Sequence, residues 1–334
     1  MKQTLGQLVR DPDAFFTAIA EGWAAIAVLN AAIECGLLDR LDEEPVPNDR
    51  LAHELGLPAD KLARLVNFLA AHELVVLGAN GNVSQSPATQ HLREAASFIG
   101  NAKVTNLAAS KLYDGLRHGV PPFEVYFGQP VFEYFAGHPE EAGQFGQFMA
   151  YMTAKVERFV FGQHRFRPFD LAVDVGGSHG GLLVRLLREH PGARGILFDL
   201  PHVAESVGDG LRSGPVGGRM DIVGGSFFEQ VPEGDLYLLK MILHDWDDEE
   251  CRAILRSVRR AIRPGGRVAV IEHIMPERPE PGEALIMDLA MMIWDTGKER
   301  KLSEYEALFD DAGFRLDRVT ENPHGQSVIE AAPV

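Results

Sequence analysis

One histidine of this sequence stands where it could move a proton. His244 closes the largely apolar run 235–243, and the acidic and aromatic run Asp245-Trp246-Asp247-Asp248 follows it directly. An imidazole, whose pKa is about 6.5, can take the proton of a hydroxyl group with a pKa of about 10 while that oxygen attacks another atom. A histidine at the end of a strand can equally be a solvated or buried residue with no chemical role. Its position alone leaves both interpretations open.

A glycine-rich turn is the second place where the residue types suggest chemistry. It reads Val-Asp-Val-Gly-Gly-Ser-His-Gly-Gly over residues 173–181 and follows a short apolar run. Glycine allows a positive φ and lets a ligand approach the backbone closely. A dinucleotide fingerprint would need glycine at 176, 178 and 181, and Ser178 occupies the position at which glycine admits a pyrophosphate. The turn therefore disfavours NAD, and a tight turn without any ligand remains an alternative.

An acidic residue follows the next predicted strand. Asp199 lies 25 positions after Asp174, at the end of the apolar run 195–198. Its carboxylate could accept hydrogen bonds from both hydroxyls of a ribose, or it could cap a helix that begins at Pro201. Together, the glycine turn and this acid favour a ligand that has a ribose but needs no pyrophosphate. S-adenosylmethionine fits that description.

These residues must be positioned by a parallel sheet. Predicted strands at 171–175, 195–198, 220–223, 235–239 and 267–272 alternate with helices such as 182–188 and 249–262. This alternation is typical of βαβ units, in which ligands bind at the carboxyl ends of the strands. We therefore predict a Rossmann-like, doubly wound α/β domain over residues 166–334.

The first half of the chain has a different pattern. Helical spacing at 23–38, 48–57 and 59–71 is followed by a hairpin at 75–83 that turns at Asn80-Gly81, which predicts a mainly helical winged-helix domain over residues 1–100. Residues 101–165 form a predicted helical connector that contributes to the acceptor pocket. Lys61 and Arg64 are the basic residues of the predicted helix 59–71, too few to favour DNA binding over dimerisation.

Composition narrows the classes of partner. The 334 residues are 46% hydrophobic and 24% charged, with a formal net charge of −16. Such a negative charge argues against nucleic acid or an anionic membrane as a partner. The two cysteines lie far apart in the sequence, and the twelve histidines do not have the spacing of metal ligands. We therefore predict no metal site. We expect a cytoplasmic protein, because no uninterrupted apolar run approaches 18 residues and the N-terminus lacks a signal-like layout.

The combination of these motifs is specific. With the Val-Asp-Val-Gly-Gly run and Phe198-Asp199-Leu200-Pro201 upstream of His-Asp-Trp, the chain resembles the small-molecule O-methyltransferases of the plant caffeate and acetylserotonin type, which include bacterial polyketide and phenazine enzymes. The resemblance continues to Lys298-Glu299-Arg300 and Ala312-Gly313-Phe314. It implies an N-terminal domain that forms a homodimer and a C-terminal Rossmann-like domain that binds S-adenosylmethionine.

The resemblance also assigns the cofactor residues. Two positions depart from the family pattern: Ser226 stands where an aspartate usually contacts the adenine amino group, and Ser178 stands where many members have a third glycine. Ser226 could form only an uncharged hydrogen bond there. The cofactor-binding residues implied are Gly176, Asp199, Leu200, Ser226, Phe227, Lys240 and Thr153.

The catalytic and acceptor residues follow in the same way. The resemblance makes His244 the general base, with Glu272 and Glu299 as the acids that orient its imidazole. Trp246 and Trp294 are candidate walls of the acceptor pocket. The acceptor-binding residues implied are Phe145, Met149, Asp245, Met291 and Asp295. A largely apolar lining predicts an aromatic or polyketide hydroxyl as the acceptor.

Three other functions remain as alternatives. Some relatives keep the fold and cofactor but hydroxylate or decarboxylate their substrates, and the retention of His244, Glu272 and Glu299 favours methyl transfer over these. An NAD(P)-dependent oxidoreductase is disfavoured by Ser178. A regulator that binds DNA through the winged helix is disfavoured by the negative charge.

Overall fold

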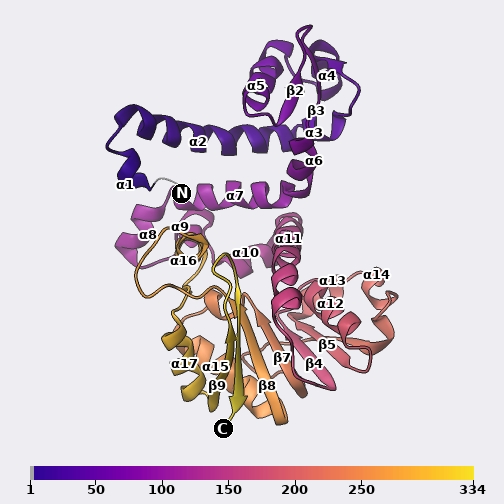
Figure 1. Ribbon diagram of the computed structural model, residues 1–334, viewed down its shortest axis with the longest axis vertical. Helices are drawn as coiled ribbons and strands as arrows, with labels where there is room; N and C mark the ends of the chain where they lie inside the picture. Colours follow the sequence, from indigo (N-terminus) through magenta and orange to yellow (C-terminus); the bar gives the residue numbers. More distant parts are fainter. Residues whose placement is uncertain (1–3) are drawn as a thin grey trace. The chain divides into compact units, whose positions relative to one another are not determined.

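The protein divides into two compact units, which part between Leu107 and Ala108. The computed structural model describes residues 4–334 (Figure 1). The three-part division predicted from the sequence (1–100, 101–165 and 166–334) stays a prediction. The second unit contains residues 108–165 of the predicted connector together with the large sheet.

The first unit combines helices with a small antiparallel sheet. Its strands β1 (Val46–Pro47), β2 (Val75–Leu77) and β3 (Asn82–Gln85) lie in the order β1-β3-β2. Its helices are α1 (Leu5–Leu8), α2 (Pro12–Glu34), α3 (Leu37–Arg40), α4 (Asn48–Leu55), α5 (Ala59–Ala71) and α6 (Pro87–Glu94), and α7 (Ala96–Ala109) crosses the boundary between the units. The predicted pair of short helices and the hairpin after them are therefore present.

Helix α2 begins well before the predicted start. Asp11 caps it, since its side chain accepts a hydrogen bond from the N–H of Ala14, and the helix continues to Glu34. Large apolar side chains on α2 are exposed, among them Phe16, Ile19 and Trp23. Within residues 4–334, α2 is the one helix long and apolar enough to cross a membrane, judged by length and composition alone, which is weak evidence.

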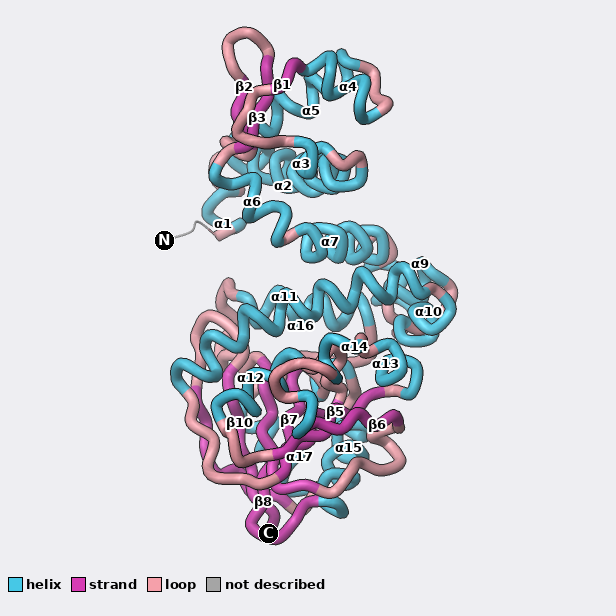
Figure 2. Tube along the Cα trace, turned by 90° about the vertical axis from the view of Figure 1, so that its right-hand side faces the viewer, coloured by secondary structure: helices cyan, strands magenta, loops and turns pink. Residues whose placement is uncertain are grey.

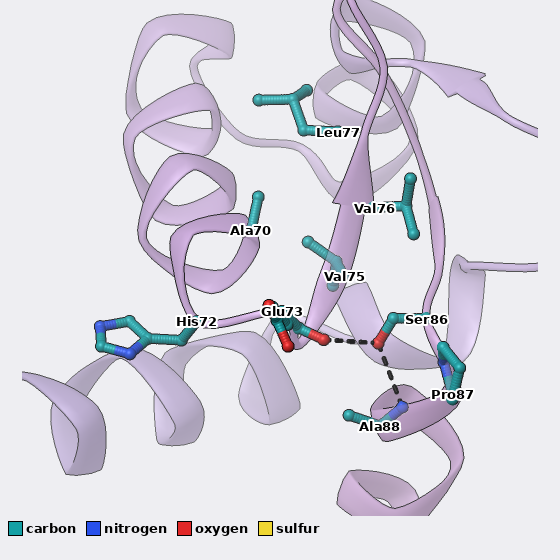
Figure 3. Close-up of a pocket in the computed structure, with 9 residues that line it drawn as sticks. All are labelled: Ala70, His72, Glu73, Val75, Val76, Leu77, Ser86, Pro87 and Ala88. Carbon is teal, nitrogen blue, oxygen red and sulfur yellow. Dashed lines mark hydrogen bonds between the residues drawn. The ribbon is translucent and has the colours of Figure 1, made fainter.

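A shallow cavity of about 570 Å³ lies between the end of α5, β2 and the start of α6. Figure 3 shows Ser86 among the residues that line it, with hydrogen bonds to Glu73 and Ala88. The Ser86 hydroxyl donates to the carbonyl of Glu73 (2.9 Å) and accepts from the N–H of Ala88 (3.1 Å). These bonds tie α6 to the turn that follows α5.

The second unit is built on a seven-stranded sheet in the order β6-β5-β4-β7-β8-β10-β9. Its strands are β4 (Leu171–Val175), β5 (Arg194–Asp199), β6 (Met220–Gly224), β7 (Gly234–Lys240), β8 (Ile262–Glu272), β9 (Phe314–Thr320) and β10 (Ser327–Pro333). The first five are parallel, and β10 is antiparallel to both β8 and β9. The antiparallel pair at the edge was not among the predicted elements.

Helices cover both faces of this sheet. Alternate residues of β7 face opposite cores: Tyr237 and Leu239 pack with α15 (Asp248–Ala261) and α17 (Leu302–Asp311), whereas Leu236 and Leu238 pack with α12 (Gly181–Glu189) and α11 (Pro139–Gln163). The remaining helices are α8 (Leu112–His118), α9 (Pro122–Phe127), α10 (Val131–Gly137), α13 (Pro201–Ser206), α14 (Asp209–Arg212) and α16 (Glu283–Trp294), with short 3₁₀ turns at Gly217–Arg219 and Leu243–Asp245. The α/β fold predicted for this region is confirmed.

Helix α11 is fastened to the sheet edge by a buried polar cluster. His164, directly after the helix, places Nδ1 2.8 Å from the Thr320 hydroxyl, and its Nε2 lies 3.7 Å from Glu330 Oε1. Arg318 donates to the other oxygen of Glu330 at 2.8 Å. Figure 2 shows α11, with α10 and α16 nearby, lying over one end of the sheet. The cluster therefore fixes the helix that carries several of the predicted pocket residues.

Candidate active site

The loop after β7 is shaped by a single carboxylate oxygen. Met241 leaves the strand with φ +54°, a conformation rare for a residue with a side chain. The backbone N–H groups of Ile242, Leu243 and His244 then all donate to Oε1 of Glu272, at 3.0, 2.6 and 3.3 Å. Glu272 is fully buried at the end of β8. Its charge therefore holds the three amides in one turn and fixes the backbone of His244.

The imidazole of His244 lies between two carboxylates. Its Nδ1 is 2.8 Å from Oε1 of Glu299, and its Nε2 is 3.3 Å from Oδ1 of Asp245. A carboxylate can only accept, so Nδ1 carries a hydrogen and donates it to Glu299. Burial opposes the charged ring, but the charges of Asp245 and Glu299 outweigh it and raise the pKa of His244 to about 10. The structure thus brings together three of the predicted residues and makes this ring a strong base.

Glu272 differs from its predicted role. It was expected to orient the imidazole with Glu299, but its oxygens bond to the backbone amides and to the hydroxyl of Tyr305, which donates to Oε2 at 2.6 Å. Glu272 lies beneath the loop rather than beside the ring, so it acts on His244 through the backbone and through its charge. Glu299 is the acid that contacts the ring.

The glycine turn leads from β4 into α12 and lies against the end of β5, where the N–H of Gly176 donates to the carbonyl of Phe198 at 2.8 Å. Gly176 has φ +67°, and a Cβ there would overlap the side chain of Ile242. Ser178 takes φ +51°, and its N–H donates to Oδ2 of Asp199 at 2.8 Å. Ser178 therefore adopts the left-handed conformation that favours glycine, and the hydrogen bond to Asp199 holds it there.

Asp199 faces this turn and does not cap a helix. Its second oxygen, Oδ1, accepts from the N–H of Leu200 at 2.7 Å, and no side chain caps α13. Burial raises the pKa of Asp199, while the bonds from Ser178 and Leu200 lower it. Each oxygen keeps a second acceptor position, which two ribose hydroxyls could use. Of the two interpretations of Asp199, helix capping is wrong.

Two further predicted cofactor residues lie beside the turn. Burial lowers the pKa of Lys240, against the opposing effect of the Asp174 carboxylate. Thr153 donates its hydroxyl hydrogen to the carbonyl of Met149 at 2.8 Å, and its methyl group lies 3.6 Å from where a Cβ on Gly181 would stand. Helix α11 therefore runs against the start of α12, next to the turn.

The remaining predicted cofactor residues are Leu200, which follows β5, and Ser226 and Phe227, which follow β6. The hydroxyl of Ser226 accepts from the N–H of Phe228 at 3.3 Å. The ring of Phe227 is edge-on to Trp246, at 5.9 Å between centroids, and Leu200 is 37% exposed. Ser226 therefore uses its oxygen to shape its own turn, without a charge.

Aromatic rings gather around the predicted acceptor residues. Phe145 stacks on Phe135 and Trp294, with centroids 4.9 and 5.6 Å apart, and Trp246 stacks on Phe132 at 5.8 Å. Met149 packs with Phe145 against the buried Phe148, Met152 and Met241, and Met291 is buried in α16. Flat rings on several elements can line a site for a flat molecule.

Two carboxylates complete this region. Asp295 directly follows α16, and burial raises its pKa to about 6. Burial also raises the pKa of Asp245 to about 7; His244 opposes this, and the charge of Asp295 adds to it. The two acids are therefore close enough to repel each other beside the base.

Sequence reasoning missed Tyr305, Arg300 and the rings of Phe132 and Phe135. Arg300 stood inside the motif used for the resemblance, but nothing in its spacing showed that it would be fully buried. In the described part of the chain, no group of three or more His, Cys, Asp or Glu side chains is arranged to hold a metal ion.

Known proteins share this sequence and architecture. The O-methyltransferase domain, as a protein family, matches residues 109–315. The phenazine O-methyltransferase PhzM of Lysobacter antibioticus is 34% identical over 320 residues, which cover 94% of each chain. The crystal structure of LaPhzM superposes with a TM-score of 0.90 at 34% identity, covering 96% of this chain and 99% of that one. CalO1, a methyltransferase in calicheamicin biosynthesis solved in its SAH-bound form, has a TM-score of 0.80 at 31% identity and covers 98% and 99% of the two chains.

Proposed function

The chain belongs to the O-methyltransferase family, and we propose that it methylates a phenolic or related hydroxyl of a small aromatic natural product with His244 as the general base. It is an enzyme that uses S-adenosylmethionine as methyl donor. The observation that carries the proposal is the buried imidazole of His244, held at Nδ1 by Glu299 with Nε2 beside Asp245.

The residues around the glycine turn fit the cofactor. A Cβ at Gly177 would lie 2.7 Å from Oδ2 of Asp174, so a residue with a side chain would crowd this turn. That Asp174 oxygen is buried without a hydrogen-bond partner. We propose that Asp199 binds the ribose hydroxyls, with Gly176, Lys240 and Thr153 around the methionine end. When bound, S-adenosylmethionine would supply an electrophilic methyl group on a sulfonium, and the thioether of S-adenosylhomocysteine would be the leaving group when the bond from that methyl carbon to sulfur breaks.

His244 would activate the acceptor. The hydroxyl of the acceptor would donate to Nε2, in the place where Asp245 now lies, and Nε2 would take its proton as the oxygen attacks the methyl carbon. A phenol has a pKa of about 10, so the proton moves between groups of similar basicity. Glu299 stabilises the imidazolium that forms. General-base help of this kind is typically worth about 10²- to 10⁴-fold in rate.

The aromatic lining supports a flat acceptor. Phe145 and Trp294 form stacked walls on α11 and α16, and Met149 and Met291 add flexible apolar contacts. The relative from Lysobacter antibioticus is named for a phenazine, itself a flat aromatic compound. We propose an aromatic acceptor, with Asp245 and Asp295 beside its reacting end.

We also propose that the winged-helix region forms a homodimer in the cytoplasm. The exposed apolar residues of α2, Phe16, Ile19 and Trp23, support an interface there. Free thiols at Cys35 and Cys251 fit a reducing compartment. Light scattering should give twice the mass of the chain for the wild type, and the mass of one chain for Trp23→Ser. A wild-type monomer would overturn the dimer, and recovery in the membrane fraction would overturn the location.

Methyl transfer with isotope-labelled S-adenosylmethionine tests the main proposal. Flat phenols and naphthols are screened, and label in an O-methyl product is the expected result. His244→Ala should lose at least 100-fold in kcat and still bind S-adenosylhomocysteine. Unlabelled hydroxylated or decarboxylated products would favour the alternative chemistry of the same fold. Full activity of His244→Ala would overturn the general-base role.

A further inference from the structure

The segment 299–305 contacts the His244 loop, here residues 241–248, from several sides. Glu299 bonds the imidazole, and the side chains of Arg300 and Tyr305 reach the backbone of the loop directly or through Glu272. We infer that Tyr305 and Arg300 are positioning residues that hold His244 in its reactive place. This inference rests on the proposed function of His244.

Tyr305 hydrogen-bonds the second oxygen of the Glu272 carboxylate, whose first oxygen binds the amides of the loop. Its hydroxyl donates to Oε2 of Glu272 at 2.6 Å, while Oε1 of the same carboxylate accepts the three backbone N–H groups. Both side chains are fully buried. A buried carboxyl group needs hydrogen bonds to its oxygens, so the Tyr305 hydroxyl holds the Glu272 side chain in the position that the loop requires.

Arg300 holds the opposite, carbonyl side of the same loop. Its guanidinium donates to the carbonyls of Leu243 (2.7 Å) and Trp246 (2.8 Å) and forms two bonds to Oδ1 of Asp248, at 3.0 and 2.8 Å. The side chain is fully buried. A carboxylate therefore holds the N–H groups of the loop and a guanidinium holds its C=O groups, each charge matched to the backbone dipoles that it meets.

The loop needs such support because its conformation is unusual. Met241 enters it with φ +54°. Gly297 packs so tightly against the backbone of His244 that a Cβ there would overlap the His244 carbonyl. Strained conformations persist where surrounding contacts hold them. A shift of about 1 Å at a reacting group can cost about 100-fold in rate, so a small relaxation of this loop would be seen in kcat.

Tyr305→Phe tests the inference by removing one oxygen. The matched control is Tyr237→Phe: Tyr237 is also fully buried, and its hydroxyl donates to the Pro232 carbonyl at 2.7 Å, away from the loop. For Tyr305→Phe we expect kcat to fall about 10-fold, with the KM of the acceptor and the Kd of S-adenosylhomocysteine within about 2-fold of wild type. Tyr237→Phe should keep the kcat of the wild type.

The titration of His244 gives a readout that does not depend on turnover. The ring faces the charges of Asp245, Glu299 and Glu272, with His273 nearby. In Tyr305→Phe the ring should move from its carboxylates, so NMR of labelled histidine should show the pKa of His244 falling toward its ordinary value. Arg300→Lys keeps the charge but cannot donate to the carbonyls of Leu243 and Trp246 at the same time. It should therefore show the same fall in the pKa of His244.

Equal kcat values and equal His244 titrations in Tyr305→Phe, Arg300→Lys and Tyr237→Phe would overturn the inference. A drop in melting temperature common to Tyr305→Phe and Tyr237→Phe, without a change in the titration, would mean that Tyr305 is an ordinary core residue. If the wild type methylated no hydroxyl, the proposed function would fail, but the NMR comparison would still decide whether Tyr305 and Arg300 position the ring.

Discussion

Replacing Glu299 by glutamine removes the negative charge at His244 and keeps an oxygen that can accept the same hydrogen bond. The two groups are 2.8 Å apart between Nδ1 and Oε1, and both side chains are almost fully buried. Glu299→Gln therefore separates the effect of the charge on the base from the effect of the hydrogen bond on its orientation.

The magnitude follows from the geometry. Two unit charges whose centres lie about 4 Å apart interact by about 4 kcal/mol at an effective dielectric constant of about 20. At about 1.4 kcal/mol for each pKa unit, this corresponds to about three units. Removing the charge of Glu299 also ends its repulsion of Asp245. The carboxylate of Asp245 is then more easily ionised and offsets part of the fall in the pKa of His244. We expect the pKa of His244 to fall by about two units.

The assay is the pH dependence of kcat from about pH 6 to pH 10.5. In the wild type the imidazole must lose its proton before it can act as a base, so kcat should rise with pH toward the raised pKa of about 10. In Glu299→Gln the rise should end about two pH units lower. The variant should be about 10-fold slower than wild type on its plateau, because a weaker base takes the proton less readily.

The free energy of unfolding should also depend on pH less steeply in Glu299→Gln than in the wild type. The pKa of His244 is higher in the folded chain than its ordinary value of about 6.5, so its contribution to the free energy of unfolding is complete below that pH and is lost as pH rises toward 10. Urea unfolding of Glu299→Gln should show a smaller loss over this range. The control is Asp311→Asn, which removes an exposed acid that pairs with Arg252. A pH profile of Glu299→Gln that coincides with those of wild type and control would refute the reasoning.

Three further variants test other parts of the site and its support. Asp199→Ala should weaken S-adenosylhomocysteine binding at least 10-fold by calorimetry, whereas His244→Ala should leave it unchanged; equal losses in both would contradict their assigned roles. Ser178→Gly should stabilise the fold by up to about 1 kcal/mol in urea unfolding, since glycine accepts φ +51° without strain, and cofactor affinity should persist because the N–H to Asp199 remains. Glu330→Gln should destabilise the fold by about 2–3 kcal/mol, because His164 and Arg318 lose the charge of a fully buried partner; an unchanged unfolding curve would show that this cluster does not hold α11.

Local sequence patterns predicted much of the fold and part of the candidate site. Alternating strands and helices predicted the parallel sheet, and the position of Asp199 at a strand end placed it correctly beside the glycine turn. These inferences succeed because periodicity and strand order are properties of neighbouring residues, and the carboxyl ends of parallel strands meet at one edge. The β9–β10 pair was not predicted. Its place in the sheet comes from the pairing of β10 with β8, which lies more than 50 positions earlier.

By itself, the sequence determined which residues could do chemistry: a base with acids around it, a turn open to a ligand, and an acid for a ribose. Only the tertiary structure decided which atoms each acid meets. Glu299 contacts His244, which lies 55 positions earlier in the sequence. Glu272 has the same carboxylate group, but its oxygens accept hydrogen bonds from three backbone amides and from the Tyr305 hydroxyl. A carboxylate binds whichever donor the packing of distant elements brings within about 3 Å, and spacing along the chain does not encode that distance.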